Sequence, residues 1–123
     1  MRNQSDLNIA RDELNTQSTQ LLETGLPDGE RQFNLTWHDW LNLQSLFDIS
    51  KVITDASLAR EDSRGAHYRE DYPETGDLDS TSYIRTSGQA DALTTETVPV
   101  EFSIVKPGES LIDDEAGAPS ARN

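Results

Sequence analysis

The sequence predicts a mainly α-helical protein that ends in a β-hairpin. Leucines recur at helical spacing before residue 25, a broader apolar set extends from Trp37 to Ala59, and apolar residues alternate with polar ones between Thr94 and Val105. Periods of 3.6 and 2 residues distinguish helices from strands. Two helices and one hairpin make a thin core for 123 residues. We therefore expect the chain to be part of something larger.

The first predicted helix runs from Ser5 to Thr24. Ser5 is expected to cap its N-terminus, and Gly25 followed by Pro27 is expected to end it. Its apolar side chains form one narrow stripe, which consists of Leu7, Ala10, Leu14, Leu21 and Leu22. Because so narrow a stripe does not stabilise an isolated helix, this helix must pack against another one.

The second predicted helix begins at Trp37 and ends at about Arg60 or Arg64. Thr36, with Asp39 three residues later, is expected to cap its N-terminus. Its apolar residues are Trp37, Trp40, Leu41, Leu43, Leu46, Phe47, Ile49, Val52, Ile53, Ala56, Leu58 and Ala59. This set is too wide for a single stripe, so we expect the helix to be covered on more than one side.

Two strands are predicted in the C-terminal part. The first centres on Tyr83–Arg85 and the second runs from Thr94 to Val105, with a hairpin loop at residues 87–92 between them. Pro99 cannot donate a hydrogen bond to a ladder, so the second strand lies at an edge or breaks there. The predicted organisation is a helical part at 1–73, a loop and hairpin at 74–107, and a disordered acidic tail at 108–123.

The charge balance restricts the classes of partner. With 10 basic and 23 acidic residues, the net charge is −13. Such a field repels phosphate backbones and anionic lipid surfaces, so nucleic-acid binding and direct membrane insertion are not expected.

The chain has no cysteine, no apolar run of the roughly 20 residues that span a bilayer, and no apolar signal-peptide core at its start. A cytoplasmic location is expected.

No residue is expected to act in catalysis, to bind a cofactor or to hold a metal. The sequence contains no GxGxxG, GxxxxGK[ST] or GxSxG pattern. His38 has no second histidine within helical reach. The charged residues around His67 could tune its imidazole for proton transfer, but hydrogen bonding at a helix terminus is favoured. The acidic residues around Asp77 lack the glycine and terminal glutamate of a calcium loop, so a solvated loop is expected.

The densest charged stretch is the segment from Ser57 to Tyr72, SLAREDSRGAHYREDY. Its alternating signs are typical of a partly buried ion-pair network, and Arg64 and Arg69 can each bind a carboxylate with two hydrogen bonds. Gly65 permits a positive φ where the helix is expected to end. We expect this segment to be an interface formed by Arg60, Ser63, Arg64, Gly65, His67, Arg69, Asp71 and Tyr72.

Within this segment, LAREDSRGAHYREDYP (Leu58–Pro73) resembles the ALARxESRGAHxRxDFP signature of the C-terminal helical domain in succinate dehydrogenase/fumarate reductase flavoprotein subunits. L-aspartate oxidases carry a related version. Asp62 replaces the glutamate of that signature. Further features that resemble the family, in the same order along the chain, are Arg2-Asn3, Asn42-Leu43 and the VPVEF stretch at Val98–Phe102.

The resemblance implies an antiparallel, spectrin-repeat-like helical bundle that is incomplete at its N-terminus, because the family's preceding helix has no counterpart before Arg2. It implies a parent protein that oxidises a dicarboxylate, or reduces fumarate, by hydride transfer to FAD. The FAD would be held by a domain upstream, and this fragment would supply no catalytic residue and no cofactor site.

The expected partners are the FAD-binding domain of the same parent chain or a companion subunit. Through partner subunits, the protein would lie at the cytoplasmic face of the inner membrane. Self-association is expected as well, because the first helix is too narrow to cover the apolar surface of the second. The residues by themselves leave one alternative open, a free-standing acidic module that binds a partner protein.

Overall fold

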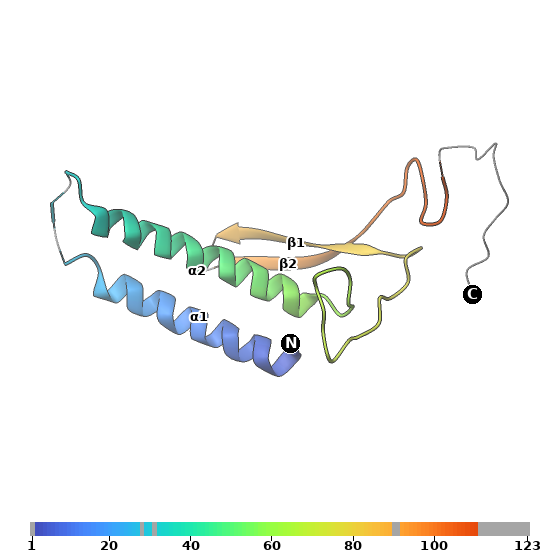
Figure 1. Ribbon diagram of the computed structural model, residues 1–123, viewed down its shortest axis with the longest axis horizontal. Coiled ribbons are helices and arrows are strands. Elements are labelled where there is room, and N and C mark those ends of the chain that lie inside the picture. The colour runs from blue at the N-terminus through green and yellow to red at the C-terminus, as the bar shows by residue number, and fades with distance from the viewer. Residues whose placement is uncertain (1, 28, 31, 90–91, 111–123) are drawn as a thin grey trace.

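The computed structural model describes residues 2–27, 29–30, 32–89 and 92–110, which form two antiparallel helices and a two-stranded sheet (Figure 1). Helix α1 spans Gln4–Thr24 and helix α2 spans Leu35–Ala59, followed by strands β1 (Ser82–Gln89) and β2 (Ala92–Pro99). Helix α2 contacts α1 and both strands, so it is the central element. The predicted mainly helical fold with a C-terminal hairpin is confirmed.

Both helices begin earlier than the sequence predicted, because asparagines cap them. The Asn3 side chain accepts a hydrogen bond from the Asp6 N–H at 2.9 Å, and the Asn34 side chain accepts one from the Trp37 N–H at 3.0 Å. The expected caps, Ser5 and Thr36, lie inside the first turns instead. An asparagine is as good a cap as serine or threonine, and the earlier one satisfies the first free N–H groups.

The C-terminal ends of both helices lie close to the predicted positions. Gly25 ends α1 with a φ of 60°, and its N–H donates to the Leu21 carbonyl at 3.2 Å. Helix α2 ends at Ala59 with Arg60 as its cap, so of the two predicted ends the earlier one is correct. The polypeptide from Glu61 to Thr81 then forms an irregular loop beyond this end of α2 (Figure 1).

The hairpin is antiparallel, with Ser82 opposite Pro99 and Gln89 opposite Ala92. Strand pairing therefore extends further toward the tip than the predicted loop at 87–92 allowed, and residues 90–91 lie outside the described residues. Strand β2 ends at Pro99, which is paired with Ser82, and the Val100 N–H beyond it still donates to the Thr81 carbonyl at 2.9 Å. The prediction that this strand continues to Val105 is wrong. The predicted tail lies outside the described residues from position 111 onward.

No apolar side chain is buried in the part of the chain that the structure describes. Five polar residues are buried instead: Asn34, Thr54, Ser57, Ser63 and Arg69. The helices are joined partly by polar contacts, since the Trp40 indole N–H donates to the Leu21 carbonyl at 3.3 Å and Lys51 donates to Ser18 at 3.2 Å.

One side of α2 remains exposed. Leu43, Leu46, Ile49 and Ile53 lie within about a third of the helix circumference, and between 42% and 58% of each is accessible. We call these four residues the α2 apolar face. They confirm that the apolar surface of α2 is wider than α1 covers. Neither helix of the described chain has the length and apolarity needed to cross a membrane.

Candidate interface around the buried Arg69

The C-terminal end of α2 is closed by Arg69, which is fully buried. Its Nη1 group donates to the carbonyls of Ser57 at 2.7 Å, Leu58 at 3.3 Å and Arg60 at 3.3 Å. These carbonyls belong to the last turn, which has no N–H partners within the helix. A cation at this position also interacts favourably with the negative end of the helix dipole.

The charge of Arg69 is neutralised by Asp71 in a bidentate pair. The Nε atom donates to Oδ1 at 2.8 Å and Nη2 donates to Oδ2 at 2.6 Å, while the guanidinium lies 4.9 Å from the centre of the Tyr72 ring. Hydrogen bonding with Arg69 lowers the pKa of Asp71, and hydrogen bonding with Asp71 raises the pKa of Arg69. Every nitrogen of the buried guanidinium therefore has an acceptor, as a buried charge requires.

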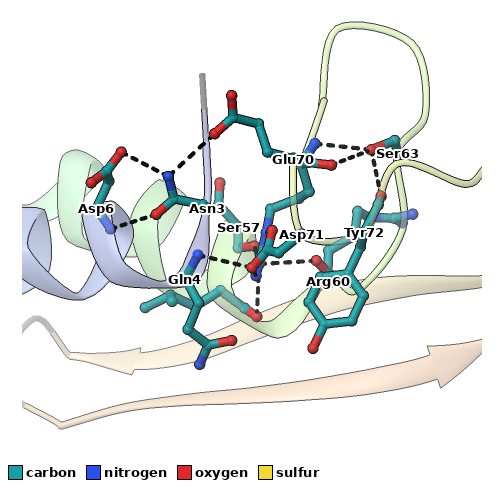
Figure 2. A network of polar contacts seen from close by, with 11 residues as sticks. Asn3, Gln4, Asp6, Ser57, Arg60, Ser63, Glu70, Asp71 and Tyr72 are labelled. Atoms are coloured by element: carbon teal, nitrogen blue, oxygen red, sulfur yellow. Dashed lines mark hydrogen bonds and ion pairs between the residues drawn. The ribbon is translucent and has the colours of Figure 1, made fainter.

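The same group of residues holds the start of the chain. We call Arg2–Gln4 the N-terminal strap. Figure 2 shows Gln4 and Asn3 beside Asp71 and Glu70: the Gln4 N–H donates to Asp71 Oδ2 at 2.9 Å and the Asn3 amide donates to Glu70 at 3.3 Å. The Glu70 N–H donates to the Arg2 carbonyl at 2.8 Å. Residues far apart in sequence are thus joined at one end of the helix pair.

Ser63 is buried and holds together the backbone of residues 63–74 by hydrogen bonds. Its buried Oγ donates to the Tyr72 carbonyl at 2.7 Å and accepts from the Arg69 N–H at 2.9 Å (Figure 2). The Ser63 N–H donates to the Glu74 carbonyl at 2.9 Å. The Ser63 hydroxyl therefore satisfies one backbone N–H and one backbone carbonyl at the same time. We call Ser57, Ser63, Arg69, Asp71 and Tyr72 the Arg69 cluster.

Replacing Ser63 with alanine is expected to lower the free energy of unfolding by about 1–3 kcal/mol, because the Arg69 N–H and the Tyr72 carbonyl lose a partner without gaining water. Urea denaturation of the 123-residue chain measures this. Ser87→Ala is the matched control, since Ser87 is exposed on β1. Equal losses in the two variants would contradict the bridging role of Ser63.

Two further arginines attach the following loop to the helix end. Asp62 accepts from Arg60 and Arg64, each at 2.8 Å. Arg64 also donates to the carbonyls of Thr75 at 2.8 Å and Asp77 at 3.1 Å and to the Thr81 hydroxyl, and Arg60 donates to the Ser82 carbonyl at 3.0 Å. These contacts position β1 against the C-terminal end of α2.

Gly65 does not end the helix, which corrects the expectation for this residue. Arg64 and His67 exchange backbone hydrogen bonds of 2.8 and 3.0 Å, which makes residues 64–67 a tight turn. Gly65 is the first central residue of this turn, and its φ of 54° suits a two-residue reverse turn with glycine there. The helix itself has already ended at Ala59.

His67 lies half-buried behind this turn. Its Nε2 atom is buried and has no hydrogen-bond partner among the described residues. Burial lowers the pKa of His67, and the nearby guanidinium groups of Arg2, Arg60 and Arg69 lower it further. A histidine that is held neutral by cations and whose Nε2 faces no partner atom fits a structural position better than proton transfer.

The structure brings all eight predicted interface residues into one connected group. Ser63 and Arg69 are buried by contacts within the chain, so a partner would meet the other six and the exposed Tyr68. The N-terminal strap, Ser57 and Asp62 also belong to this group and were not among the predicted interface residues. The pairing of Asp62 could have been predicted from the sequence, since an acidic residue between Arg60 and Arg64 can pair with both.

A protein-family profile described as the fumarate reductase flavoprotein C-terminus matches residues 1–111. The chain belongs to this family. The fumarate reductase flavoprotein subunit of Mycobacterium tuberculosis is 29% identical over 106 residues, which cover 85% of this chain and 18% of that protein. L-aspartate oxidase 1 of Ralstonia nicotianae is 45% identical over 38 residues, 31% of this chain and 7% of that protein.

The fold comparison agrees. A chain of the Mycobacterium smegmatis Sdh1 complex in the apo form superposes with a TM-score of 0.65 at 28% identity, covering 84% of this chain and 18% of that chain. The resemblance drawn from Leu58–Pro73 is therefore confirmed. This chain spans about a fifth of the length of the flavoprotein subunit that it matches. The free-standing acidic module receives no support from these similarities.

The family consists of flavoproteins, and this domain is not their FAD-binding domain. The described residues do not fit FAD. A dinucleotide site presents free N–H groups of a helix N-terminus after a glycine-rich turn. Here Asn3 and Asn34 cap both helices, and the described residues form no group of three or more side chains suited to a metal ion.

Proposed function

We propose that this chain serves as the non-catalytic C-terminal domain of an FAD-dependent oxidoreductase of the succinate dehydrogenase/fumarate reductase type. In this role it packs against the FAD-binding domain of the parent protein and presents a docking surface. The observation that carries the proposal is the family match over residues 1–111. The parent protein would oxidise a dicarboxylate or reduce fumarate, and FAD and the reacting groups would lie outside this chain.

Two features of the structure support a docking role. The α2 apolar face gathers four exposed large apolar side chains on one side of a helix, so a partner surface is expected to cover it. The Arg69 cluster is satisfied within the chain, so it forms a rigid end on which exposed side chains such as Tyr68 are held in place.

Companion subunits are the second class of partner, because the structurally similar chain belongs to an Sdh1 complex. We propose that attachment to such subunits brings the domain to the cytoplasmic face of the inner membrane, and that the domain is cytoplasmic without them.

The proposal is tested by mixing the 123-residue chain with the FAD-containing remainder of the flavoprotein encoded in the same reading frame. We expect the remainder alone to keep the flavin absorbance, the chain alone to retain none after desalting, and the mixture to co-elute. Ile49→Lys should weaken co-elution by about tenfold or more, since it places a charge in the apolar contact. Ser87→Lys adds the same charge on exposed β1 and serves as the control.

Retention of flavin by the chain alone would contradict the non-catalytic role. The absence of any flavoprotein sequence in the reading frame, or of co-elution, would contradict the docking role.

A further inference from the structure

We propose that His67 acts as a proton-sensitive latch, whose neutral imidazole keeps the N-terminal strap bound to the 64–67 turn and whose protonation releases the strap. The latch is a property of the folded chain itself and does not depend on the proposed function.

The position of His67 joins four parts of the structure. Its backbone closes the 64–67 turn, and the Ala66 carbonyl of that turn accepts a hydrogen bond from Arg2 Nη1 of the strap at 3.1 Å. Its side chain lines a groove of about 380 Å³ between the end of α2 and β1. The other residues that line this groove are Ile53, Ala56, Ser57, Arg60, Tyr83 and Ile84, and none of them is acidic.

Three guanidinium groups act on the His67 side chain and lower its pKa. Arg2 belongs to the strap, Arg60 to the end of α2, and Arg69 to the cluster beneath them; β1 contributes Tyr83 and Ile84. Two of these three guanidinium groups have a carboxylate partner, since Arg60 pairs with Asp62 and Arg69 pairs with Asp71. Arg2 has no carboxylate within ion-pair distance among the described residues, so its guanidinium is the one that an added positive charge would displace most easily.

Protonation of His67 would create two unfavourable interactions in this place. A fourth positive charge would lie among three guanidinium groups, and the buried Nε2 would carry an N–H with no acceptor. The hydrogen bond with the Arg60 backbone opposes these effects but is the weakest influence on the pKa. Release of the strap as a whole relieves the repulsion, and it breaks both the hydrogen bond from the Arg2 side chain to the Ala66 carbonyl and the one from the Glu70 N–H to the Arg2 carbonyl.

The direction of the pH dependence follows from these effects. We call the form with the strap bound the closed state and the form with the strap detached the released state. Because the pKa of His67 is lower in the closed state than the ordinary value of 6.5, protons bind preferentially to the released state. The preference for the closed state is complete above about pH 6.5 and is lost as the pH falls through the lowered pKa of the folded form.

Hydrogen exchange of the Glu70 amide, whose acceptor is the Arg2 carbonyl, reports on the strap in the 123-residue chain. Protection is compared about one pH unit above and one unit below 6.5, after correction for the intrinsic exchange rate. We expect it to fall at the lower pH, by up to the roughly tenfold that one pH unit below 6.5 allows, in the unmodified chain and in His38→Gln, which replaces the exposed histidine on α2. In His67→Gln it should not change.

Equal protection at both pH values in the unmodified chain would overturn the latch, and so would a loss of protection that persists in His67→Gln. If His67→Gln does not fold, the ring proton of His67 in the unmodified chain provides the second measurement. Its NMR titration must then share its midpoint with the loss of Glu70 protection, and two separate midpoints would overturn the proposal.

Discussion

Replacing Arg69 with alanine is expected to lower the free energy of unfolding by about 3–5 kcal/mol, because it removes a fully buried guanidinium and all of its charge-assisted hydrogen bonds. The substitution leaves the carbonyls at the end of α2 without a donor and Asp71 without its cation. Small domains have only about 5–15 kcal/mol of stability in total. Urea denaturation followed by circular dichroism should show a strongly reduced midpoint or no cooperative transition.

Arg85→Ala is the matched control for this substitution. Arg85 also pairs with a carboxylate, Glu96 at 2.9 Å, but both side chains are about half exposed. Exposed pairs contribute less than about 1 kcal/mol. Similar losses in the Arg69 and Arg85 variants would contradict the role of burial. Arg69→Lys should fall between them, because an ammonium keeps the charge but cannot reach three carbonyls and a carboxylate at once.

The 123-residue chain is expected to self-associate through the α2 apolar face when no other partner covers it. Ile49→Glu should raise the dissociation constant by about tenfold or more, since burying such a side chain contributes about 1.5–3 kcal/mol. The association should strengthen with added salt, because each copy carries a net charge of −13 and salt screens the repulsion. Sedimentation velocity over a range of concentrations measures both effects.

Leu78→Glu provides the control for self-association. Leu78 is 50% exposed, close to the 57% of Ile49, but it lies in the loop before β1 and not on α2. It introduces the same negative charge without changing the α2 apolar face. A monodisperse monomer of the unmodified chain at every concentration would contradict the prediction, and so would equal effects of the two substitutions.

The elements of the fold could be predicted where a local physical rule determines them. Helical spacing gave the two helices, Gly25 gave the end of the first, and the alternation of apolar and polar residues gave the second strand but not its end. The start of each helix could not be predicted in this way. Ser5 and Asn3 are equivalent caps by residue type, and the choice depends on where the strap meets Glu70 and Asp71, contacts that are remote in sequence.

The sequence was enough to locate the segment that forms the candidate interface. It was not enough to predict which of its residues contact one another. Density of charge and the resemblance located the segment. Arg64 and Arg69 are both followed or preceded by acidic residues, yet only Arg69 is buried, because it alone faces the free carbonyls of the last turn of α2. Gly65 was assigned to the helix end because glycine serves helix ends and tight turns equally well.

The contact between Gln4 and Asp71 joins residues that are 67 positions apart. The entropy lost on closing a loop grows with its length, whereas the pairing of α1 with α2 and of β1 with β2 needs only shorter closures. We therefore expect the two helices and the hairpin to form early in folding, and the strap to join the Arg69 cluster in the last step. Substitutions in the strap should then accelerate unfolding and leave the folding rate nearly unchanged.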